Sequence, residues 1–336
     1  MPDRHPPSDG RPGRPSKAKD AGPTVAFDSR RSAEPSGIGR YVRSLLPELI
    51  ANGAGTIVET HRPRPRRVDV FHAPCLEGAL LRSPVPMVVT LHDMTPLKRR
   101  GEFLRTGLGL RMRYLAAQRA VRVIVPTEAV AGDAIEHLHL DRDRIAVIGE
   151  ASASVLTHRS EGEVAGVRAR HALPDRYLLW VGGLEHPEPR KRVAALADAP
   201  RRMPLVLVGR AGRWAQELAD VHLTGEVTDD DLAAIYTGAH ALVFPSADEG
   251  FGLPPIEALA CGTPVVACDV PALREVLGSR VTFVAAGDFA GLIAAGEAAT
   301  RPASRPPAWT WADAAEATWQ VYRDAVTARG GAAPRA

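Results

Sequence analysis

Residues 246–266 read SADEGFGLPPIEALACGTPVV and place two glutamates, Glu249 and Glu257, on either side of a segment rich in glycine and proline. Neither a continuous helix nor a continuous strand accommodates such a segment. An apolar stretch, residues 241–244, precedes it, and small and apolar residues follow it. This order predicts a buried strand, a glycine-containing loop, a short helix that begins near Pro254, and a further buried strand.

The loop between that strand and that helix is predicted to bind an anion. In parallel sheets, ligands bind beside the carboxyl ends of the strands. The first N–H groups of a helix are unpaired and lie at its positive end, so they attract anions. We therefore assign Phe251, Gly252 and Leu253 to an anion cradle, with Glu249 and Glu257 as hydrogen-bond acceptors on its two sides. On spacing alone, an ordinary capped helix with two exposed acids is the simpler interpretation.

On both sides of this stretch, short apolar segments alternate with amphipathic ones, which is typical of parallel α/β sheets. Six strands are predicted before a polar connector at residues 151–175, and six after it. The predicted strands are 24–28, 56–60, 68–73, 86–92, 122–127, 144–149, 177–183, 205–209, 221–225, 240–246, 263–268 and 281–285. The predicted helices of the first half are 40–51, 104–120 and 128–138.

This alternation predicts an α/β protein of two domains. We expect a first Rossmann-like domain at residues 24–160 and a second at residues 161–308. Residues 309–328 predict a helix that packs back towards the first domain. The polar, proline-rich residues 1–23 and the short end at 329–336 are expected to be disordered.

Composition narrows the functions that fit the chain. The 336 residues are 45% hydrophobic and 24% charged, with a formal net charge of +3, and the chain beyond its first residues is nearly neutral. Near neutrality argues against a general nucleic-acid binder. No run approaches the roughly 18 apolar residues of a membrane span, and the start is too polar for a signal peptide. The three cysteines follow neither metal-site nor disulfide spacing, so we expect free thiols in a cytoplasmic protein.

Segments from both halves of the chain resemble glycosyltransferase family 4, a group of retaining enzymes with the GT-B fold, and most closely its bacterial mannosyltransferase-like members. The resemblance covers nearly all of residues 24–326. It is carried by EGFGLPPIEALACGTPVV (249–266), DSRRSAEPSGIGRYVRSLL (28–46), VVTLHDMTPL (88–97) and YLLWVGGLEHPEPRKRV (177–193).

The resemblance implies two Rossmann-like domains that face each other across a cleft, the first for the acceptor and the second for a nucleotide sugar. It implies retention of the sugar's configuration, no required metal or other cofactor, and a glycan, lipid-linked or small-molecule acceptor. Among donors it favours GDP-mannose over UDP-sugars. The acidic triplet at residues 229–231 is interpreted as the first turn of a helix rather than as a metal site.

Three residues are expected to take part in the chemistry. By the resemblance, Glu249 hydrogen-bonds the transferred sugar, and His92, at the end of a strand, contacts the sugar's hydroxyl groups. Lys191 stabilises the charge that grows on the departing diphosphate. Taken singly, a histidine at a strand end is usually a packing residue, and a basic loop is usually solvated. The insertion HPE at residues 186–188 departs from the family and leaves open which cation reaches the phosphates.

The remaining site residues are expected to bind the donor. By the resemblance, Glu257 accepts hydrogen bonds from the ribose hydroxyls, and Arg190 contacts the diphosphate. Gly37 and Gly39 precede a helix that is expected to start near Arg40. Across the cleft, these two glycines present backbone N–H groups to the donor.

Two other classes of function stay open at this point. A sugar-nucleotide epimerase shares the two-domain architecture, and a non-catalytic sugar-nucleotide-binding protein would make the same donor contacts, so fold analogy cannot choose among them. The basic, partly apolar segment at residues 97–120 predicts either contact with an anionic membrane that holds a lipid-linked acceptor, or an ordinary solvated helix.

Overall fold

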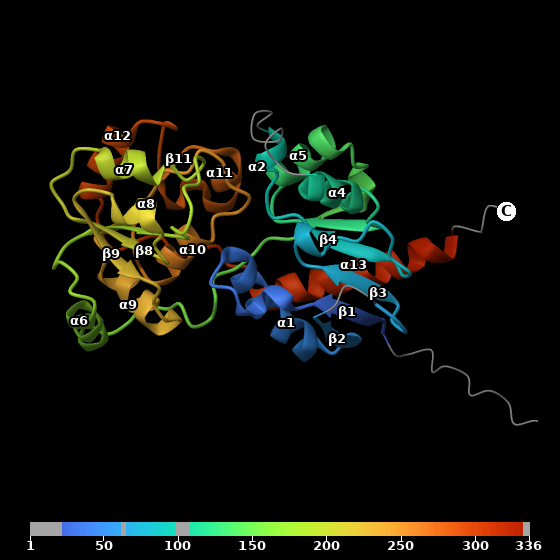
Figure 1. The fold of residues 1–336 in the computed structure, drawn as a ribbon. Helices are drawn as coiled ribbons and strands as arrows, with labels where there is room; N and C mark the ends of the chain where they lie inside the picture. The colour runs from blue at the N-terminus through green and yellow to red at the C-terminus, as the bar shows by residue number, and fades with distance from the viewer. Residues whose placement is uncertain (1–21, 62–64, 99–107, 332–336) are drawn as a thin grey trace, which may run out of the picture.

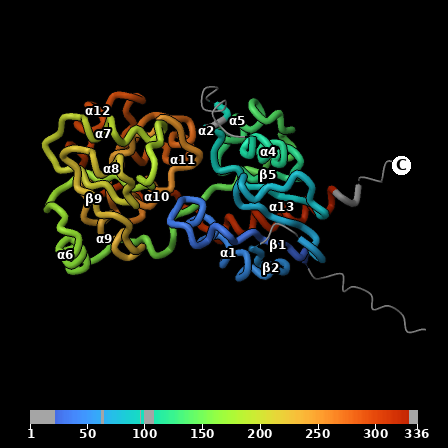
Figure 2. The backbone as a smooth tube through the Cα atoms, viewed as in Figure 1, coloured from blue at the N-terminus to red at the C-terminus, as the bar shows by residue number. Residues whose placement is uncertain are grey.

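The computed structural model describes residues 22–61, 65–98 and 108–331 of the chain (Figures 1 and 2). Each half contains a parallel six-stranded sheet flanked by helices, which confirms the expected α/β architecture of two Rossmann-like domains. The ends expected to be disordered lie mostly outside these residues. At their inner edges the backbone is regular, because the Pro23 carbonyl accepts a hydrogen bond from Thr56 N–H and the last helix continues to Gly331.

The elements of the first domain are β1 (Thr24–Asp28), the 3₁₀ helix η1 (Arg30–Ala33), α1 (Gly37–Asn52), β2 (Thr56–Thr60), β3 (Val70–Ala73), η2 (Leu76–Gly78), β4 (Met87–Thr90), α2 (Thr95–Lys98), α4 (Leu108–Ala117), β5 (Arg122–Val125), α5 (Glu128–Leu138), η3 (Arg142–Arg144) and β6 (Ile145–Val147).

The elements that follow are α6 (Glu161–Arg170), β7 (Leu178–Val181), α7 (Val193–Asp198), β8 (Leu205–Val208), α8 (Arg213–Gln216), β9 (Val221–Gly225), α9 (Asp229–Gly238), β10 (Ala241–Phe244), α10 (Leu253–Ala260), β11 (Val265–Cys268), α11 (Pro271–Leu277), η4 (Gly278–Arg280), β12 (Thr282–Val284), α12 (Phe289–Glu297) and α13 (Trp311–Gly331).

The predicted strands are all present in the described residues, several of them shorter than expected. The predicted helix at 128–138 is α5, with the expected bounds. The predicted helix at 104–120 corresponds to α4, which spans 108–117, and residues 99–107 lie outside the described part of the chain. α1 begins at Gly37 rather than near Arg40, because Ser36 provides an N-terminal cap that the sequence interpretation missed.

Strand order explains where the site forms. The second sheet runs β9-β8-β7-β10-β11-β12, so the chain moves outward from β7 in one direction and then returns to continue from β10 in the other. Ligands in open α/β sheets bind in the crevice at such a switch point, beside the carboxyl ends of the two strands. The loop that follows β7 carries the predicted Arg190 and Lys191, and the loop that follows β10 carries the predicted Glu249, Phe251 and Gly252. In the first sheet, ordered β2-β1-β3-β4-β5-β6, the loop after β1 leads to α1.

α13 lies against the first domain, although it follows the second in sequence (Figure 1). Its Trp319 is buried and donates a hydrogen bond from Nε1 to the Leu49 carbonyl of α1 at 3.0 Å. Its Tyr322 hydroxyl is 2.6 Å from Nδ1 of the buried His72, whose Nε2 is 2.9 Å from Thr90 Oγ1. The chain therefore crosses between the domains twice, once after β6 and once before α13.

Candidate active site

The loop from β10 to α10 brings the second domain into contact with the first. Gly252 is the N-terminal cap of α10, and Pro254 lies in its first turn, as predicted. Gly250 packs so closely against the end of β4 that a Cβ at this position would collide with the His92 carbonyl oxygen. Thr127 Oγ1 also donates a hydrogen bond to the Gly250 carbonyl at 3.0 Å. Only glycine at position 250 permits this approach of the two domains.

Most of the predicted site residues line one hollow of about 360 Å³ in the cleft, namely Gly37, His92, Arg190, Lys191, Glu249, Phe251, Gly252 and Leu253. A second hollow, of about 610 Å³, shares part of this wall and includes Glu257. Within the described residues, the N–H groups of Phe251, Gly252 and Leu253 donate to no protein acceptor. The first turn of α10 thus offers the predicted anion cradle at the edge of the smaller hollow.

Glu249 lies in the smaller hollow beside a guanidinium group. Arg190 Nη1 is 3.3 Å from its Oε2, and the same arginine lies 3.9 Å from Asp93 of the first domain. Burial raises the pKa of Glu249, and the Arg190 charge offsets only part of that rise. With one cation beside it, the carboxyl group keeps free acceptor positions for a sugar hydroxyl.

Glu188, from the inserted HPE segment, contacts both cations of the basic loop. Lys191 Nζ donates to its Oε1 at 2.7 Å, and Arg190 Nε is 3.3 Å from its Oε2. The side chains of Lys191 and Glu188 are 19% and 40% exposed. Both cations border the hollow, and Glu188 offsets part of their charge at the place predicted for the diphosphate.

His92 borders the same hollow, and both of its ring nitrogens bond to the protein. Nε2 donates to the Pro74 carbonyl at 2.9 Å, and Nδ1 lies 2.9 Å from Oε1 of the buried Glu150. Burial lowers the pKa of His92, but the hydrogen bond and charge of Glu150 outweigh it, so the net pKa is raised. Two acceptors around one ring favour the imidazolium form. For His92 to contact a sugar hydroxyl as predicted, one of these two hydrogen bonds must be replaced by a bond to the sugar.

Glu257 is 2% exposed and lies in the wall of the second hollow, the one of about 610 Å³. Tyr236 donates a hydrogen bond to its Oε2 at 3.0 Å, and Arg40 Nε of the first domain lies 3.0 Å from its Oε1. Burial raises the pKa of Glu257, while the Arg40 charge and the Tyr236 hydrogen bond lower it. The carboxylate that is predicted to bind the ribose therefore also forms an ion pair between the domains, which the sequence did not predict.

Gly37 and Gly39 occupy the first turn of α1 and do not precede it, so the predicted arrangement is corrected here. Gly37 borders both hollows, and a Cβ there would meet open space. The N–H of Gly39 is satisfied by Ser36 Oγ at 3.1 Å, and a Cβ at position 39 would collide with the Glu34 carbonyl. Gly39 thus allows η1 to pack against α1, whereas Gly37 alone of the two faces the cleft.

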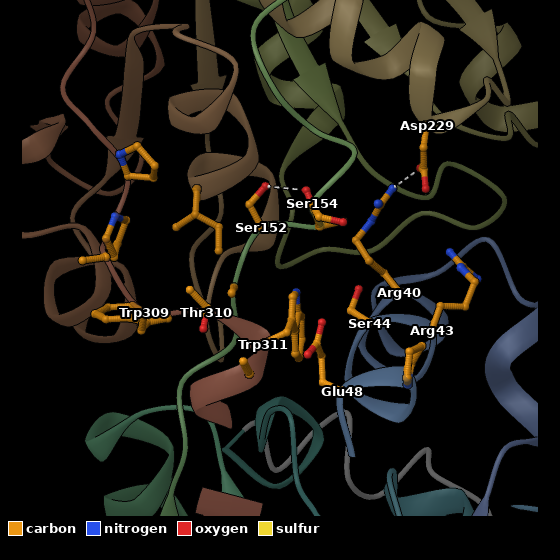
Figure 3. A pocket seen from close by; sticks show the side chains of 18 residues that line it. Arg40, Arg43, Ser44, Glu48, Ser152, Ser154, Asp229, Trp309, Thr310 and Trp311 are labelled. Carbon is orange, nitrogen blue, oxygen red and sulfur yellow. Dashed lines mark hydrogen bonds and ion pairs between the residues drawn. The ribbon is translucent and has the colours of Figure 1, made fainter. Parts of the chain in front are cut away.

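A third hollow, of about 680 Å³, lies between α1, the connector after β6 and the segment that leads into α13 (Figure 3). It is lined by Trp309, Trp311 and several serines, and it includes no predicted site residue. Figure 3 shows Arg40 extending to Asp229, with a 2.7 Å bond from Nη2 to Oδ1. Arg40 and Asp229 also line the hollow around Glu257, so the two spaces meet at this ion pair.

Three residues of the site escaped the sequence interpretation. Arg40 is a cation in the first turn of a helix, where the helix dipole disfavours positive charge, and that conflict was the available signal. Glu188 lies in the insertion before the basic pair, and Glu150 lies after β6, immediately before the predicted connector. Their partners are far away in sequence, so no local pattern identifies them.

The described part of the chain contains neither a metal site nor a membrane-spanning helix. No group of three or more His, Cys, Asp and Glu side chains in that part of the chain is arranged to hold a metal ion. None of its helices combines the length and the apolar character needed to cross a membrane. Cys75, Cys261 and Cys268 are buried free thiols, as predicted.

Two parallel-sheet domains that meet at the carboxyl ends of their strands are the architecture of GT-B proteins. The Anabaena protein HepE (Alr3699), solved in complex with UDP-glucose, has a similar structure, with a TM-score of 0.63 over 92% of this chain and 97% of that chain. Its sequence is 19% identical, so this likeness establishes the fold alone.

Residues 175–299 match the family described as Glycosyl transferases group 1, and residues 60–150 match Glycosyltransferase Family 4. The two matches together cover more than half of the sequence, and the chain belongs to glycosyltransferase family 4.

Two curated relatives are similar to part of this chain. The serotype-specific mannosyltransferase WbdA of Escherichia coli is 30% identical over 222 residues, which are 58% of this chain and 27% of WbdA. The O-antigen chain mannosyltransferase B of Escherichia coli is 30% identical over 194 residues, 50% of each chain. The matched region thus spans from about a quarter to half of these relatives.

Proposed function

We propose that this protein is a retaining glycosyltransferase that moves a hexose, with mannose favoured, from a nucleotide-diphosphate sugar to a glycan or lipid-linked acceptor. The observation that carries the proposal is the composition of the smaller hollow. Glu249, the Arg190–Lys191 pair and the open amides of α10 face His92 of the other domain in one space of about 360 Å³. Hydrogen-bond acceptors that can hold a sugar lie there beside hydrogen-bond donors that can hold a diphosphate.

In the proposed reaction, the bond from the sugar's C1 to the diphosphate oxygen breaks while the acceptor oxygen bonds to C1 on the same face. The departing diphosphate oxygen takes the proton of the acceptor hydroxyl. Arg190, Lys191 and the α10 amides stabilise the negative charge that develops on the diphosphate. Glu249 orients the sugar by accepting from its hydroxyl groups, and His92 of the first domain contacts a further hydroxyl group from across the hollow.

Metal independence belongs to the same proposal. Two cations and a helix N-terminus at the leaving group supply the charge that a divalent ion provides elsewhere. We expect sugar transfer to persist in excess EDTA. We also expect NMR to show the same anomeric configuration in the product as in the donor. Loss of transfer with EDTA that returns with added metal would contradict metal independence, and an inverted product would contradict retention.

Mannose and GDP are proposed because the matched relatives are named mannosyltransferases. The name of the solved HepE complex includes UDP-glucose, so base and sugar are tested together. The epimerase alternative gains no support from the family matches. An epimerase would convert a nucleotide sugar without an acceptor, whereas a transferase releases the nucleoside diphosphate.

Contact with an anionic membrane is proposed for α4. Leu108, Met112 and Leu115 recur on one helical face and are 75%, 36% and 48% exposed. Arginines interrupt this face, and the rest of the basic segment, residues 99–107, lies outside the described part of the chain. The protein is expected to sediment with anionic but not with neutral vesicles. A cytoplasmic site of action, at the inner face of the membrane, is proposed together with this contact. Equal or no binding to the two vesicle types would refute it.

The decisive experiment for function is a donor panel. GDP- and UDP-linked sugars are incubated with the protein, and release of nucleoside diphosphate is followed with and without candidate acceptors. We expect release from one donor, with GDP-mannose favoured, and loss of release in Glu249→Gln with donor binding retained. Binding without turnover for every donor and acceptor would instead favour the non-catalytic alternative.

A further inference from the structure

Arg40 is the one residue of the first domain whose side chain forms ion pairs with both Glu257 and Asp229 among the described residues. Its side chain is only 15% exposed. Nε lies 3.0 Å from Glu257 Oε1. Nη2 donates to Asp229 Oδ1 at 2.7 Å, the contact marked by a dashed line in Figure 3. A guanidinium group divided between two carboxylates in this way is held in a fixed orientation.

The contacts of Glu257 leave a defined capacity for a ligand. An ionised carboxylate offers about four acceptor positions, two on each oxygen. Tyr236 occupies one position on Oε2, and Arg40 lies beside Oε1. The described residues therefore leave one acceptor position on each oxygen unpaired; Oε1 is itself buried, and Glu257 lines a hollow of about 610 Å³. Two neighbouring hydroxyl groups, as in the 2′,3′-diol of a ribose, match that pair.

The charge of Glu257 depends on the same arginine. A fully buried carboxylate is expensive unless a cation and hydrogen bonds accompany it. If the carboxyl group were protonated, one of its oxygens would become a donor and lose acceptor capacity. Tyr236 supplies a hydrogen bond but no charge, and Asp229 is itself anionic. The cation that compensates Glu257 thus comes from the opposite domain.

We propose that Arg40 is a positioning residue that fixes the orientation and the negative charge of Glu257, so that the ribose diol of the donor is recognised only when the two domains face each other. The inference rests on the proposed nucleotide-sugar function. It adds to that function a specificity determinant in the first domain, although the nucleotide-binding elements lie in the second.

The test compares nucleotides that differ by one hydroxyl group. Dissociation constants for GDP and 2′-deoxy-GDP, and for UDP and 2′-deoxy-UDP, are measured by calorimetry for the wild type and for Arg40→Met, Arg40→Lys and Glu257→Gln. Arg43→Met is the matched control, because Arg43 lies on the next turn of α1 and, within the described part of the chain, its side chain bonds to the Ser32 and Glu34 carbonyls rather than to a carboxylate. Melting temperatures establish that each variant is folded.

For its preferred base, the wild type is expected to bind the ribonucleotide at least about tenfold more tightly than the deoxy form, as for one lost hydrogen bond to a charged group. Arg40→Met should lose most of this preference, because the ribonucleotide loses more affinity than the deoxy form, which contacts Glu257 only through its 3′-hydroxyl group. Arg40→Lys should keep part of the preference, and Arg43→Met all of it. Removing Arg40 in a Glu257→Gln background should cost no further preference.

Three results would overturn the inference. An equal loss of affinity for both nucleotides in Arg40→Met would mean that Arg40 only holds the domains together. A preserved preference with unchanged affinity for both nucleotides in that variant would mean that Glu257 recognises ribose unaided. If the wild type binds no nucleoside diphosphate at all, the proposed function fails and this inference fails with it, whereas the first two results leave that function intact.

Discussion

Replacing Glu188 with glutamine should tighten the binding of a nucleoside diphosphate. In the structure, Glu188 contacts Lys191 at 2.7 Å and Arg190 at 3.3 Å, the two cations proposed to hold the diphosphate. A ligand diphosphate must therefore displace this carboxylate before it binds. Glutamine keeps the size of the side chain but removes the charge that competes with the ligand.

The magnitude follows from the exposure of the three side chains. They are 19–40% exposed, so solvent screens the contacts and each is worth about 0.2–1 kcal/mol. Two such contacts total roughly 0.4–2 kcal/mol, and because about 1.4 kcal/mol is a factor of ten, a gain of about 2- to 30-fold in affinity is expected. The gain should shrink at high ionic strength, where exposed charges are screened.

Calorimetric titration with GDP or UDP, whichever binds the wild type, measures the effect. Glu185→Gln is the matched control, because Glu185 lies on the same loop and makes no ion pair within 4.0 Å in the described part of the chain. The gain should also vanish when Lys191 and Arg190 are both replaced by alanine. Unchanged or weaker binding in folded Glu188→Gln, or an equal gain in Glu185→Gln, would refute the competition.

The remaining predictions concern single residues. Glu257→Ala should weaken nucleoside diphosphate binding by roughly 1–3 kcal/mol, and unchanged affinity in the folded variant would remove its ribose role. Lys191→Ala should lower turnover far more than melting temperature, because the phosphate charge grows in the transition state; a collapsed melting temperature with normal turnover would make Lys191 structural. Burial lowers the pKa of His72 to about 3, so between that value and its ordinary pKa of about 6.5 the unfolded state binds the extra proton. The contribution of neutral His72 to the free energy of unfolding is complete above pH 6.5 and falls by at most about 1.4 kcal/mol per pH unit below it. The free energy of urea unfolding, measured from pH 7 to 5, should therefore depend less steeply on pH for His72→Gln than for the wild type. An identical slope would contradict this assignment.

The strands and the α10 loop were predictable because their signals are local. The apolar run at 241–244, the glycines that follow it and the proline in the first helical turn act within a few residues of each other. The same holds for the free thiols and for α5, which begins at a Thr127 cap and ends as expected. Each of these features is decided by short-range sterics and burial.

The electrostatic partners were not predictable in this way. Arg40 and Glu257 meet only because two separately folded domains dock, and the His92–Glu150 bond depends on the path of the connector. The start of α1 was placed too late because the local Ser36 cap was overlooked, whereas the collision that excludes a side chain at Gly39 depends on how η1 folds back. Sequence patterns specify elements, whereas these contacts depend on tertiary packing.

The central claim is that the cleft between the two domains transfers a sugar from a nucleotide donor. The most direct test follows nucleoside diphosphate release and the fate of the sugar, by mass spectrometry, for the wild type and for Lys191→Ala, across the donor panel and with a mannan oligosaccharide as acceptor. The account predicts that one donor is consumed, that its sugar is added to the acceptor, and that Lys191→Ala binds the donor but transfers far more slowly. Conversion of the donor to another nucleotide sugar, or transfer by Lys191→Ala at the wild-type rate, would contradict it.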